Sequence, residues 1–297
     1  MAKKSINITK YSLDSLQAKV SWHMTPDVVV SEQPLQIILH WYSEQQWHQR
    51  ELSMTMRTPG DDKILVVGFL LSQQIITAIS DIQSIKLDEE NVAEVKLSPL
   101  VQVDWQQLSR TFVSHSGCGI CGQSQLKSLA LNYSAFSSSS NSSSQGVWLS
   151  AQQIISLPAL LAKQQTIFAK TGGCHGAGIW CNEQFLVCED VGRHNAVDKV
   201  IGRLLQLRQQ VRSSPQMEEQ RILVLSGRVS FELVQKAIAG KIAIIVAVGA
   251  PSDLAVATAK QFNMTLIGFV KPMSFNVYCG QDRIIHNDGS EIETNLG

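Results

Sequence analysis

The chain has 297 residues, of which 44% are hydrophobic, so it is long enough for one large or two ordinary domains with a buried core. Its 25 basic and 25 acidic side chains give a formal net charge of zero, so there is no general electrostatic attraction to nucleic acid or to a membrane surface, and we expect neither partner. The lysines near the start are not followed by an apolar run, which argues against a secretory signal. Six cysteines in a chain of this size fit a reducing cytoplasm.

Residues 1–133 are predicted to form a smaller, β-rich N-terminal domain. Leu35–Tyr42 and Glu51–Arg57 alternate apolar and polar side chains, as half-exposed strands do. Asp62–Gln74 indicates an edge segment followed by a helix. Residues 134–146 are mostly serine and cannot bury a face, which predicts a flexible linker.

Two cysteines, Cys118 and Cys121, lie in the sequence Gly-Cys-Gly-Ile-Cys-Gly near the end of this domain. Glycine has no side chain to cover a thiolate, and the Cys-x-x-Cys spacing favours a lowered thiol pKa. The pattern predicts reactive sulfur and makes these two residues the catalytic candidates. A structural zinc site needs a second close pair of ligands, which the other four cysteines do not supply. A thioredoxin-like dithiol remains open.

Residues 147–297 are predicted to form an α/β core. Short apolar runs alternate there with helical patterns, which is typical of a sheet with helices on both faces. The predicted strands are Arg221–Leu225, Ala243–Val248 and Leu266–Val270, with helices at Ser230–Ala239 and Ser252–Phe262 between them. Upstream, helices are predicted at Leu157–Lys170 and Asn195–Val211, with a hairpin of Gly178–Trp180 and Phe185–Cys188 between them.

Five polar or glycine-rich loops follow strand ends or open helices in this predicted core, where ligands bind in open α/β sheets. Arg193 and His194 lie at a predicted helix start, which suits a phosphate or a polar ring edge. Arg228 and Lys271 add cations after later strands. Together the loops predict a site for a large, multiply charged ligand. They span residues 170–176, 189–199, 226–230, 249–252 and 269–275.

Five blocks of residues together resemble the FdhD family, over roughly residues 32–280. The Glu-Asp-Val-Gly-Arg-His-Asn-Ala block is the most specific of them. The matching blocks are residues 117–122, 171–175, 189–202, 226–232 and 275–278. Members of the family are formate dehydrogenase accessory proteins that act as sulfur carriers.

The resemblance implies a cytoplasmic homodimer whose C-terminal core is similar to the cytidine deaminase fold. It implies a sulfurtransferase that accepts persulfide sulfur from a cysteine desulfurase. We expect Cys118 to bear the persulfide with Cys121 as its partner, but glycine flanks both thiols, so the sequence leaves the choice between them open. The implied acceptor is the molybdenum bis(molybdopterin guanine dinucleotide) cofactor, or a tungsten form, before its insertion into formate dehydrogenase; no permanently bound metal is expected. The implied cofactor-binding residues are Gly172, Gly173, His175, Arg193, His194, Asn195, Arg228, Phe269, Val270, Lys271, Pro272, Met273 and Ser274.

The chain also departs from the family pattern. Cys174 stands where relatives commonly have a small non-thiol residue and Cys279 where threonine is frequent, so these thiols either join a sulfur relay or are incidental. Met273 and Ser274 replace a pair that often resembles Gly-Arg, and the serine-rich segment is an unusual insertion. Two other functions stay open: a dithiol–disulfide oxidoreductase, and a cofactor-binding chaperone that transfers no sulfur.

Overall fold

The computed structural model describes residues 2–14, 19–89, 91–105, 108, 129–130, 132–136, 149–181, 184–210 and 221–285. The chain divides into two compact units. Unit 1 comprises Met1–Val113, Lys163–Ala177 and Leu186–Arg212, and unit 2 comprises Ser114–Ala162, Gly178–Phe185 and Ser213–Gly297. The sequence predicts three consecutive parts, residues 1–133, 134–146 and 147–297, whereas each compact unit combines segments from different parts of the chain. The three-part domain division stays a prediction.

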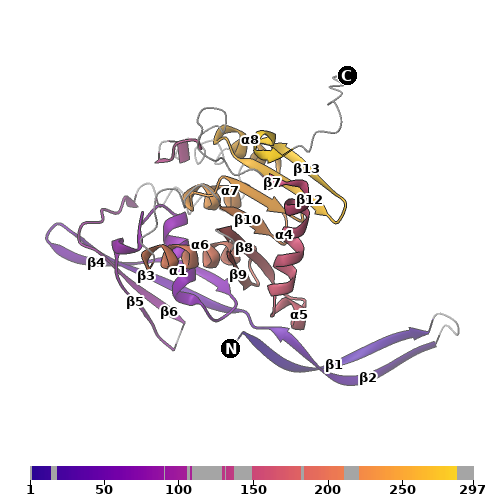
Figure 1. The fold of residues 1–297 in the computed structure, drawn as a ribbon. Helices are drawn as coiled ribbons and strands as arrows, with labels where there is room; N and C mark the ends of the chain where they lie inside the picture. The colour runs from indigo at the N-terminus through magenta and orange to yellow at the C-terminus, as the bar shows by residue number, and fades with distance from the viewer. Residues whose placement is uncertain are drawn as a thin grey trace. The chain divides into compact units, whose positions relative to one another are not determined.

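Unit 1 contains a two-stranded hairpin and a four-stranded sheet (Figure 1). The sheet has the order β4-β3-β6-β5, in which β3 and β6 run parallel and the other neighbours run antiparallel. Leu35, Ile37 and Leu39 are buried, which confirms the alternating pattern predicted for their strand. The strands of unit 1 are β1 (Lys3–Asp14), β2 (Lys19–Val30), β3 (Gln33–Ser43), β4 (Gln46–Arg57), β5 (Ile82–Leu87) and β6 (Val92–Leu97).

Helix α1 (Asp62–Ser72) begins directly after a sharp turn that follows β4. Gly60 and Asp61 take positive φ angles of 109° and 59° in this turn. The buried guanidinium of Arg57 then donates to both carboxylate oxygens of Asp62, at 2.8 and 3.0 Å, and so fixes the first helical turn. The edge segment predicted at the start of Asp62–Gln74 is wrong, because the helix begins at Asp62 itself.

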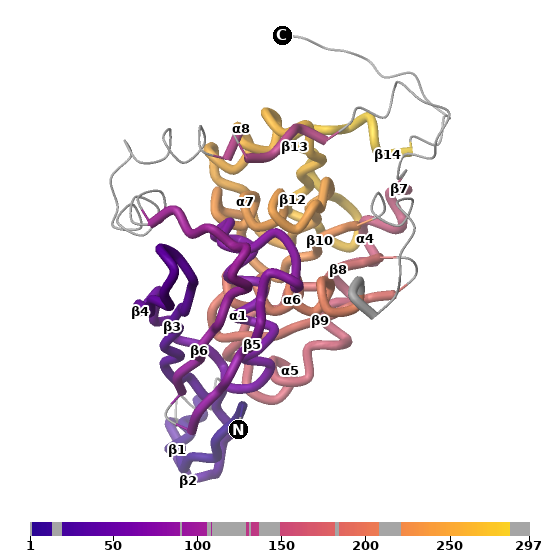
Figure 2. Tube along the Cα trace, turned by 90° about the vertical axis from the view of Figure 1, so that its left-hand side faces the viewer, coloured from indigo at the N-terminus to yellow at the C-terminus, as the bar shows by residue number. Residues whose placement is uncertain are grey.

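Helix α6 (Arg193–Gln210) packs against α1 at two glycines, and the two helices lie side by side in Figures 1 and 2. A Cβ atom on Gly68 of α1 would collide with the backbone carbonyl of Asp198, and one on Gly202 of α6 would collide with that of Ile64. The backbones therefore touch directly, which only glycine permits. The Ser72 hydroxyl adds a hydrogen bond of 2.8 Å to the Asp198 carboxylate.

Three strands of unit 2 run parallel in the order β12-β11-β10, and β13 pairs antiparallel with β12. All residues of β10 and β11 are buried, whereas β12 is buried except at Phe269 and Lys271. The sheet order continues through β8 to β9, whose residues are divided between the two units. The mixed α/β class predicted from the sequence is confirmed, whereas the likeness to cytidine deaminase stays a prediction. These elements are β8 (His175–Cys181), β9 (Gln184–Asp190), β10 (Ile222–Leu225), α7 (Phe231–Ala239), β11 (Ile244–Ala247), α8 (Asp253–Gln261), β12 (Thr265–Lys271) and β13 (Ser274–Cys279).

The helix predicted at Leu157–Lys170 is two helices, α4 (Ala151–Gln164) and α5 (Phe168–Thr171). The chain leaves the helical path at Gln165 because the Glu189 carboxylate accepts hydrogen bonds of 2.8 Å from the backbone amides of Ile167 and Phe168. A carboxylate at this position caps the start of α5.

The described residues also contain four minor elements. They are the 3-10 turns η1 (Ile79–Asp81) and η3 (Gln281–Arg283), and β7 (Leu149–Ser150), which pairs parallel with β14 (Ile284–Ile285). Within the described ranges, no helix is both long enough and apolar enough to cross a membrane.

The glycine contact between α1 and α6 generates a stability prediction. Replacing glycine by alanine inside a helix normally favours the helix by about 1 kcal/mol. We expect Gly202→Ala to destabilise the protein by about 2–4 kcal/mol instead, because the new methyl group meets a backbone carbonyl that no rotamer change can move. Chemical denaturation measures this change. Gln206→Ala, at an exposed position of the same helix, is the control and should shift stability by under about 0.5 kcal/mol.

Candidate functional site

The start of α6 is anchored by the buried carboxylate of Asp190, which is 0% exposed. This carboxylate accepts hydrogen bonds from the backbone amides of Thr58 at 3.1 Å and Gly192 at 2.9 Å, and from the Asn195 side chain at 3.3 Å. The Lys199 ammonium forms an ion pair with it at 2.7 Å. Four other chain positions are therefore held around this one carboxylate.

Lys199 and Thr58 complete this buried network. The Lys199 ammonium also donates to the backbone carbonyls of Thr58 at 2.8 Å and of Glu189 at 3.4 Å. The Thr58 hydroxyl accepts a hydrogen bond from the Val191 amide at 3.0 Å. Sequence reasoning missed Thr58, whose only local signal is its place before the Pro59-Gly60 turn.

Asn195, a predicted ligand residue, is 9% exposed and faces the protein. Its amide donates to the Met56 carbonyl at 2.7 Å and accepts from the Thr55 hydroxyl at 3.1 Å. These bonds join the end of β4 to the first turn of α6. The side chain is thus engaged within unit 1, where it positions the helix start.

Arg193 and His194, at the start of α6 in unit 1, interact electrostatically with His175, and all three side chains are half-buried. Burial lowers the pKa of His175, and the charges of Arg193 and His194 lower it further, so its ring is neutral at physiological pH. The buried Nε atom of Arg193 has no hydrogen-bond partner among the described residues. The first turn contains no acidic side chain. A helix start with these groups is compatible with an anion or a polar ring edge.

The predicted glycine-rich loop precedes His175 and ends helix α5. Gly172 has a φ of 63°, and its amide donates to the Phe168 carbonyl at 2.7 Å. A Cβ atom on Gly173 would lie 2.8 Å from the side chain of Val30. Both glycines are exposed, and the turn delivers His175 to the start of β8.

In unit 2, backbone hydrogen bonds bring three of the predicted ligand loops together at the carboxyl edge of β10, β11 and β12. The Gly249 amide donates to the Gly227 carbonyl at 3.1 Å, and the Phe269 amide donates to the Gly249 carbonyl at 3.2 Å. The Val229 amide donates to the Ala250 carbonyl at 3.0 Å. This edge is where open α/β sheets bind ligands.

Exposed cations and a strained aromatic residue occupy this edge. Arg228 and Lys271 are exposed, and Phe269 is 42% exposed with a φ of 52°, in an irregular stretch of the β12–β13 pairing. A bulky side chain at positive φ costs on the order of 1–2 kcal/mol, and such strain clusters at functional sites. Of the other predicted residues here, Pro272, Met273 and Ser274 are exposed and Val270 is buried.

Cys118 and Cys121 lie outside the described residues. Three other thiols are buried: Cys174, Cys188 and Cys279 are 6%, 4% and 8% exposed. Burial raises the pKa of all three, to about 12 for Cys174 and about 11 for Cys188. The Cys174 thiol also donates to the Glu189 carboxylate at 3.3 Å, which further favours its protonated form. These three thiols are therefore protonated at neutral pH.

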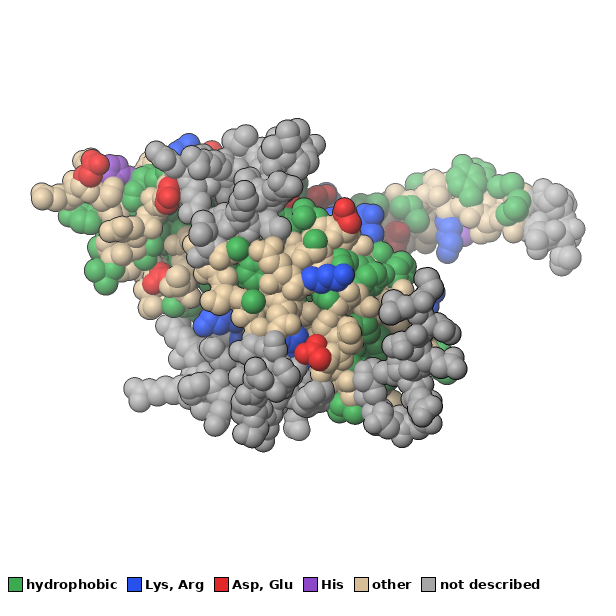
Figure 3. All heavy atoms as spheres, turned by 90° about the horizontal axis from the view of Figure 1, so that it is seen from above, with side chains coloured by type: hydrophobic (Ala, Val, Ile, Leu, Met, Phe, Trp, Pro, Cys, Tyr) green, Lys and Arg blue, Asp and Glu red, His purple; other side chains and the backbone are tan. Residues whose placement is uncertain are grey.

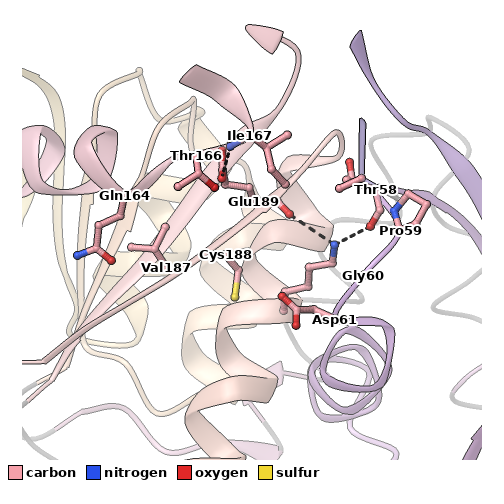
Figure 4. A pocket seen from close by; sticks show the side chains of 12 residues that line it. Thr58, Pro59, Gly60, Asp61, Gln164, Thr166, Ile167, Val187, Cys188 and Glu189 are labelled. Atoms are coloured by element: carbon pink, nitrogen blue, oxygen red, sulfur yellow. Dashed lines mark hydrogen bonds between the residues drawn. The ribbon is translucent and has the colours of Figure 1, made fainter. Parts of the chain in front are cut away.

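A cavity of about 330 Å³ lies in unit 1 beside this network (Figure 4). Figure 4 shows Cys188 and Glu189 on one wall and the Thr58–Asp61 turn on another. Its charged lining groups are already paired, because Lys199 binds Asp190, Glu189 caps α5, and Asp61 pairs with Arg203. The charged groups that line the cavity therefore have partners within the protein and do not need a ligand to balance them.

The geometry defines a mixed α/β protein with an anion-compatible helix start in one unit and a cationic strand edge in the other. The sequence profile of the FdhD/NarQ family matches residues 30–285. The chain belongs to this family.

Relatives across bacteria and archaea agree with this assignment. The chain is 37% identical to the "Sulfur carrier protein FdhD" of Streptomyces coelicolor over 270 residues, which cover 87% of this chain and 89% of the relative. It is 38% identical to the protein of the same description from Sulfolobus acidocaldarius over 260 residues, covering 87% and 91%. A crystal structure from Desulfotalea psychrophila, described as a formate dehydrogenase accessory protein, aligns with a TM-score of 0.66 at 23% identity, covers 95% of this chain and 99% of its own, and supports the fold.

The buried thiols generate a prediction about chemical labelling. Only a thiolate reacts rapidly with iodoacetamide, so Cys174 and Cys188 should stay unmodified in the folded protein at neutral pH and become labelled in denaturant. Their folded pKa values lie above the unfolded value of about 8.5. The stability linked to the protonated thiols is therefore complete below about pH 8 and is lost as pH rises from about 9 towards about 12.

Peptide mass spectrometry at a series of pH values checks this prediction. Labelling of both cysteines should accelerate only in that alkaline range. Rapid labelling of Cys174 in the folded protein at neutral pH would show that the thiol is more acidic than its surroundings indicate.

Proposed function

We propose that this protein is a sulfur carrier in the maturation of formate dehydrogenase, acting in the cytoplasm as a homodimeric sulfurtransferase. It accepts persulfide sulfur from a cysteine desulfurase on Cys118 and passes it to the molybdenum bis(molybdopterin guanine dinucleotide) cofactor. The relatives described as sulfur carrier proteins support this role. The structural observation that carries the proposal is the contrast among the thiols. Cys174, Cys188 and Cys279 are buried and protonated, whereas the predicted reactive pair is flanked by glycine.

The proposed transfer has two balanced steps. In the first, the Cys118 thiolate attacks the outer sulfur of the desulfurase persulfide, takes up that sulfur and releases the desulfurase thiolate. In the second, the Cys121 thiolate attacks the inner sulfur of the Cys118 persulfide, which forms a Cys118–Cys121 disulfide and releases hydrosulfide to the cofactor. A dithiol reductant then restores both thiols. Cys121 is therefore proposed as the resolving partner.

Each unit, taken by itself, contains groups that are proposed to recognise a group of the cofactor. In unit 1, Arg193, His194 and the neutral His175, with the backbone of Gly172 and Gly173, receive a guanine nucleotide group, and Asn195 holds the helix start in place. In unit 2, Arg228 and Lys271 receive phosphate while Phe269 offers a face to a planar ring. Charge-assisted bonds from arginine to phosphate are among the stronger polar contacts in proteins.

The first test measures sulfur loading. After incubation with a cysteine desulfurase and cysteine, mass spectrometry should find one added sulfur on the peptide that contains Cys118. Cys118→Ala should lose this adduct and client activation while keeping the wild-type unfolding midpoint. Cys121→Ala should keep the persulfide and deliver it poorly, because no thiol remains to release hydrosulfide.

Controls separate the three candidate functions. Cys174→Ala should load and deliver sulfur normally. Disulfide reduction without any sulfur adduct would support an oxidoreductase. Full client activation by the Cys118→Ala, Cys121→Ala double variant would support a chaperone that carries no sulfur.

The second test concerns the nucleotide group. Arg193→Ala should weaken GDP binding by about 1.5–3 kcal/mol, the range for a charge-assisted hydrogen bond. Calorimetry measures the affinity. Arg203→Ala removes an arginine from the same helix whose guanidinium pairs with Asp61, and it should leave GDP affinity unchanged. Equal affinities for wild type and Arg193→Ala would remove the helix start from the proposed site.

A further inference from the structure

The β1–β2 hairpin is a long ribbon of unit 1 that lies almost entirely outside the segment matched by the family profile, which begins at residue 30. All twelve residues of each strand are paired, from Lys3 with Val30 to Asp14 with Lys19. At its base, Val30 approaches Gly173 closely. Figure 1 shows the ribbon extending away from the sheet of unit 1.

The register divides the outer half of the ribbon into two different faces. Residues that pair directly across an antiparallel ribbon lie on the same face, and the faces alternate along each strand. One face carries the pairs Thr9–Met24, Tyr11–Trp22 and Leu13–Val20. The opposite face carries the pairs Lys10–His23 and Ser12–Ser21. One side of the ribbon is therefore apolar and the other polar.

The apolar face is open to solvent. Tyr11 is 67% exposed, Leu13 71%, Val20 61%, Trp22 65% and Met24 68%. Figure 3 shows hydrophobic side chains gathered towards the free end of the ribbon. Exposed apolar side chains scattered singly are normal, but five adjacent ones on one face mark an interaction surface.

The ribbon also needs a partner for its own stability. An isolated two-stranded hairpin is marginally stable in water, and a hydrophobic face has to pack against something. The five side chains are 61–71% exposed, so together they offer on the order of 500 Å² of surface. Two such faces bury on the order of 1,000 Å² in total, which is about the lower size limit of a specific protein interface.

We infer that this face binds the same face of a second copy of the chain. Two ribbons packed face to face about 10 Å apart form a small sandwich of four strands. A two-fold axis through the Tyr11–Trp22 pair makes the contact self-complementary and closes it at two copies. This face is then the contact surface of the homodimer, which is itself part of the proposed function.

A second copy fits this face better than a charged partner does. The apolar face holds no charged side chain, whereas Lys10 and His23 lie on the opposite face, where they stay in water when two apolar faces meet. Two copies of this face also match each other in size and together reach about the lower limit for a specific interface.

The test uses the full chain with three substitutions on the apolar face, Tyr11→Thr, Trp22→Thr and Met24→Thr, which keep a β-branched residue in each strand. Sedimentation equilibrium should show a dimer for wild type and at least a hundredfold weaker association for the triple variant, because each lost side chain removes a large buried apolar area. The matched control, Lys10→Thr, Ser12→Thr and His23→Thr on the opposite face, should associate like wild type.

A photo-crosslinking residue at position 11 keeps the test decisive if the triple variant loses its hairpin. Irradiation should join two copies through a peptide from residues 19–30, whereas the same probe at position 12, on the polar face, should not. A monomeric wild type, an undiminished dimer in the triple variant, or crosslinks only to a different protein would each overturn the inference. Sulfur loading on Cys118 is measured separately, so a failure here is distinguishable from a failure of the sulfur-carrier proposal.

Discussion

The buried ion pair between Lys199 and Asp190 is the constraint on which unit 1 depends. Its atoms are 2.7 Å apart, and the two side chains are 3% and 0% exposed. Two charges withdrawn from water are tolerated only when their remaining donors and acceptors are also satisfied. Thr58 and Asn195 supply hydrogen bonds to the pair. These bonds hold the first turn of α6 against the end of β4. The polar groups at the helix start are held in place as a consequence.

Close packing of α6 on α1 also holds α6 in place. Gly68 and Gly202 let the backbones of the two helices touch directly. Other side chains are exposed and therefore remain available to a ligand. Arg228 and Lys271 are exposed at a strand edge whose loops are joined by backbone bonds, and Phe269 is held there at a strained φ. A rigid frame that presents a few exposed polar and aromatic groups is a common basis for ligand recognition.

Local patterns in the sequence determined much of the fold. The alternation at Leu35–Tyr42 and the apolar runs of the C-terminal half predict strands that the structure contains, because hydrophobic periodicity depends on near neighbours only. The Glu-Asp-Val-Gly-Arg-His-Asn-Ala block was specific enough to indicate the family that the comparisons show. The register of the β1–β2 ribbon explains why alternating residues such as Tyr11 and Leu13 lie on one face, although no strand was predicted there.

Tertiary structure alone decided which polar residues are fixed inside the protein and which face outward. Lys199 binds the carbonyl of Thr58, 141 positions away in the chain, and Glu189 ends a predicted helix by capturing amides at Ile167 and Phe168. The pKa values of Cys174 and Cys188 depend on burial that distant segments provide. The sequence by itself determined the elements and the family, because those follow from neighbouring residues and whole motifs. Charge pairing, desolvation and helix breaks depend on residues far apart in the chain, so only the folded structure could decide them.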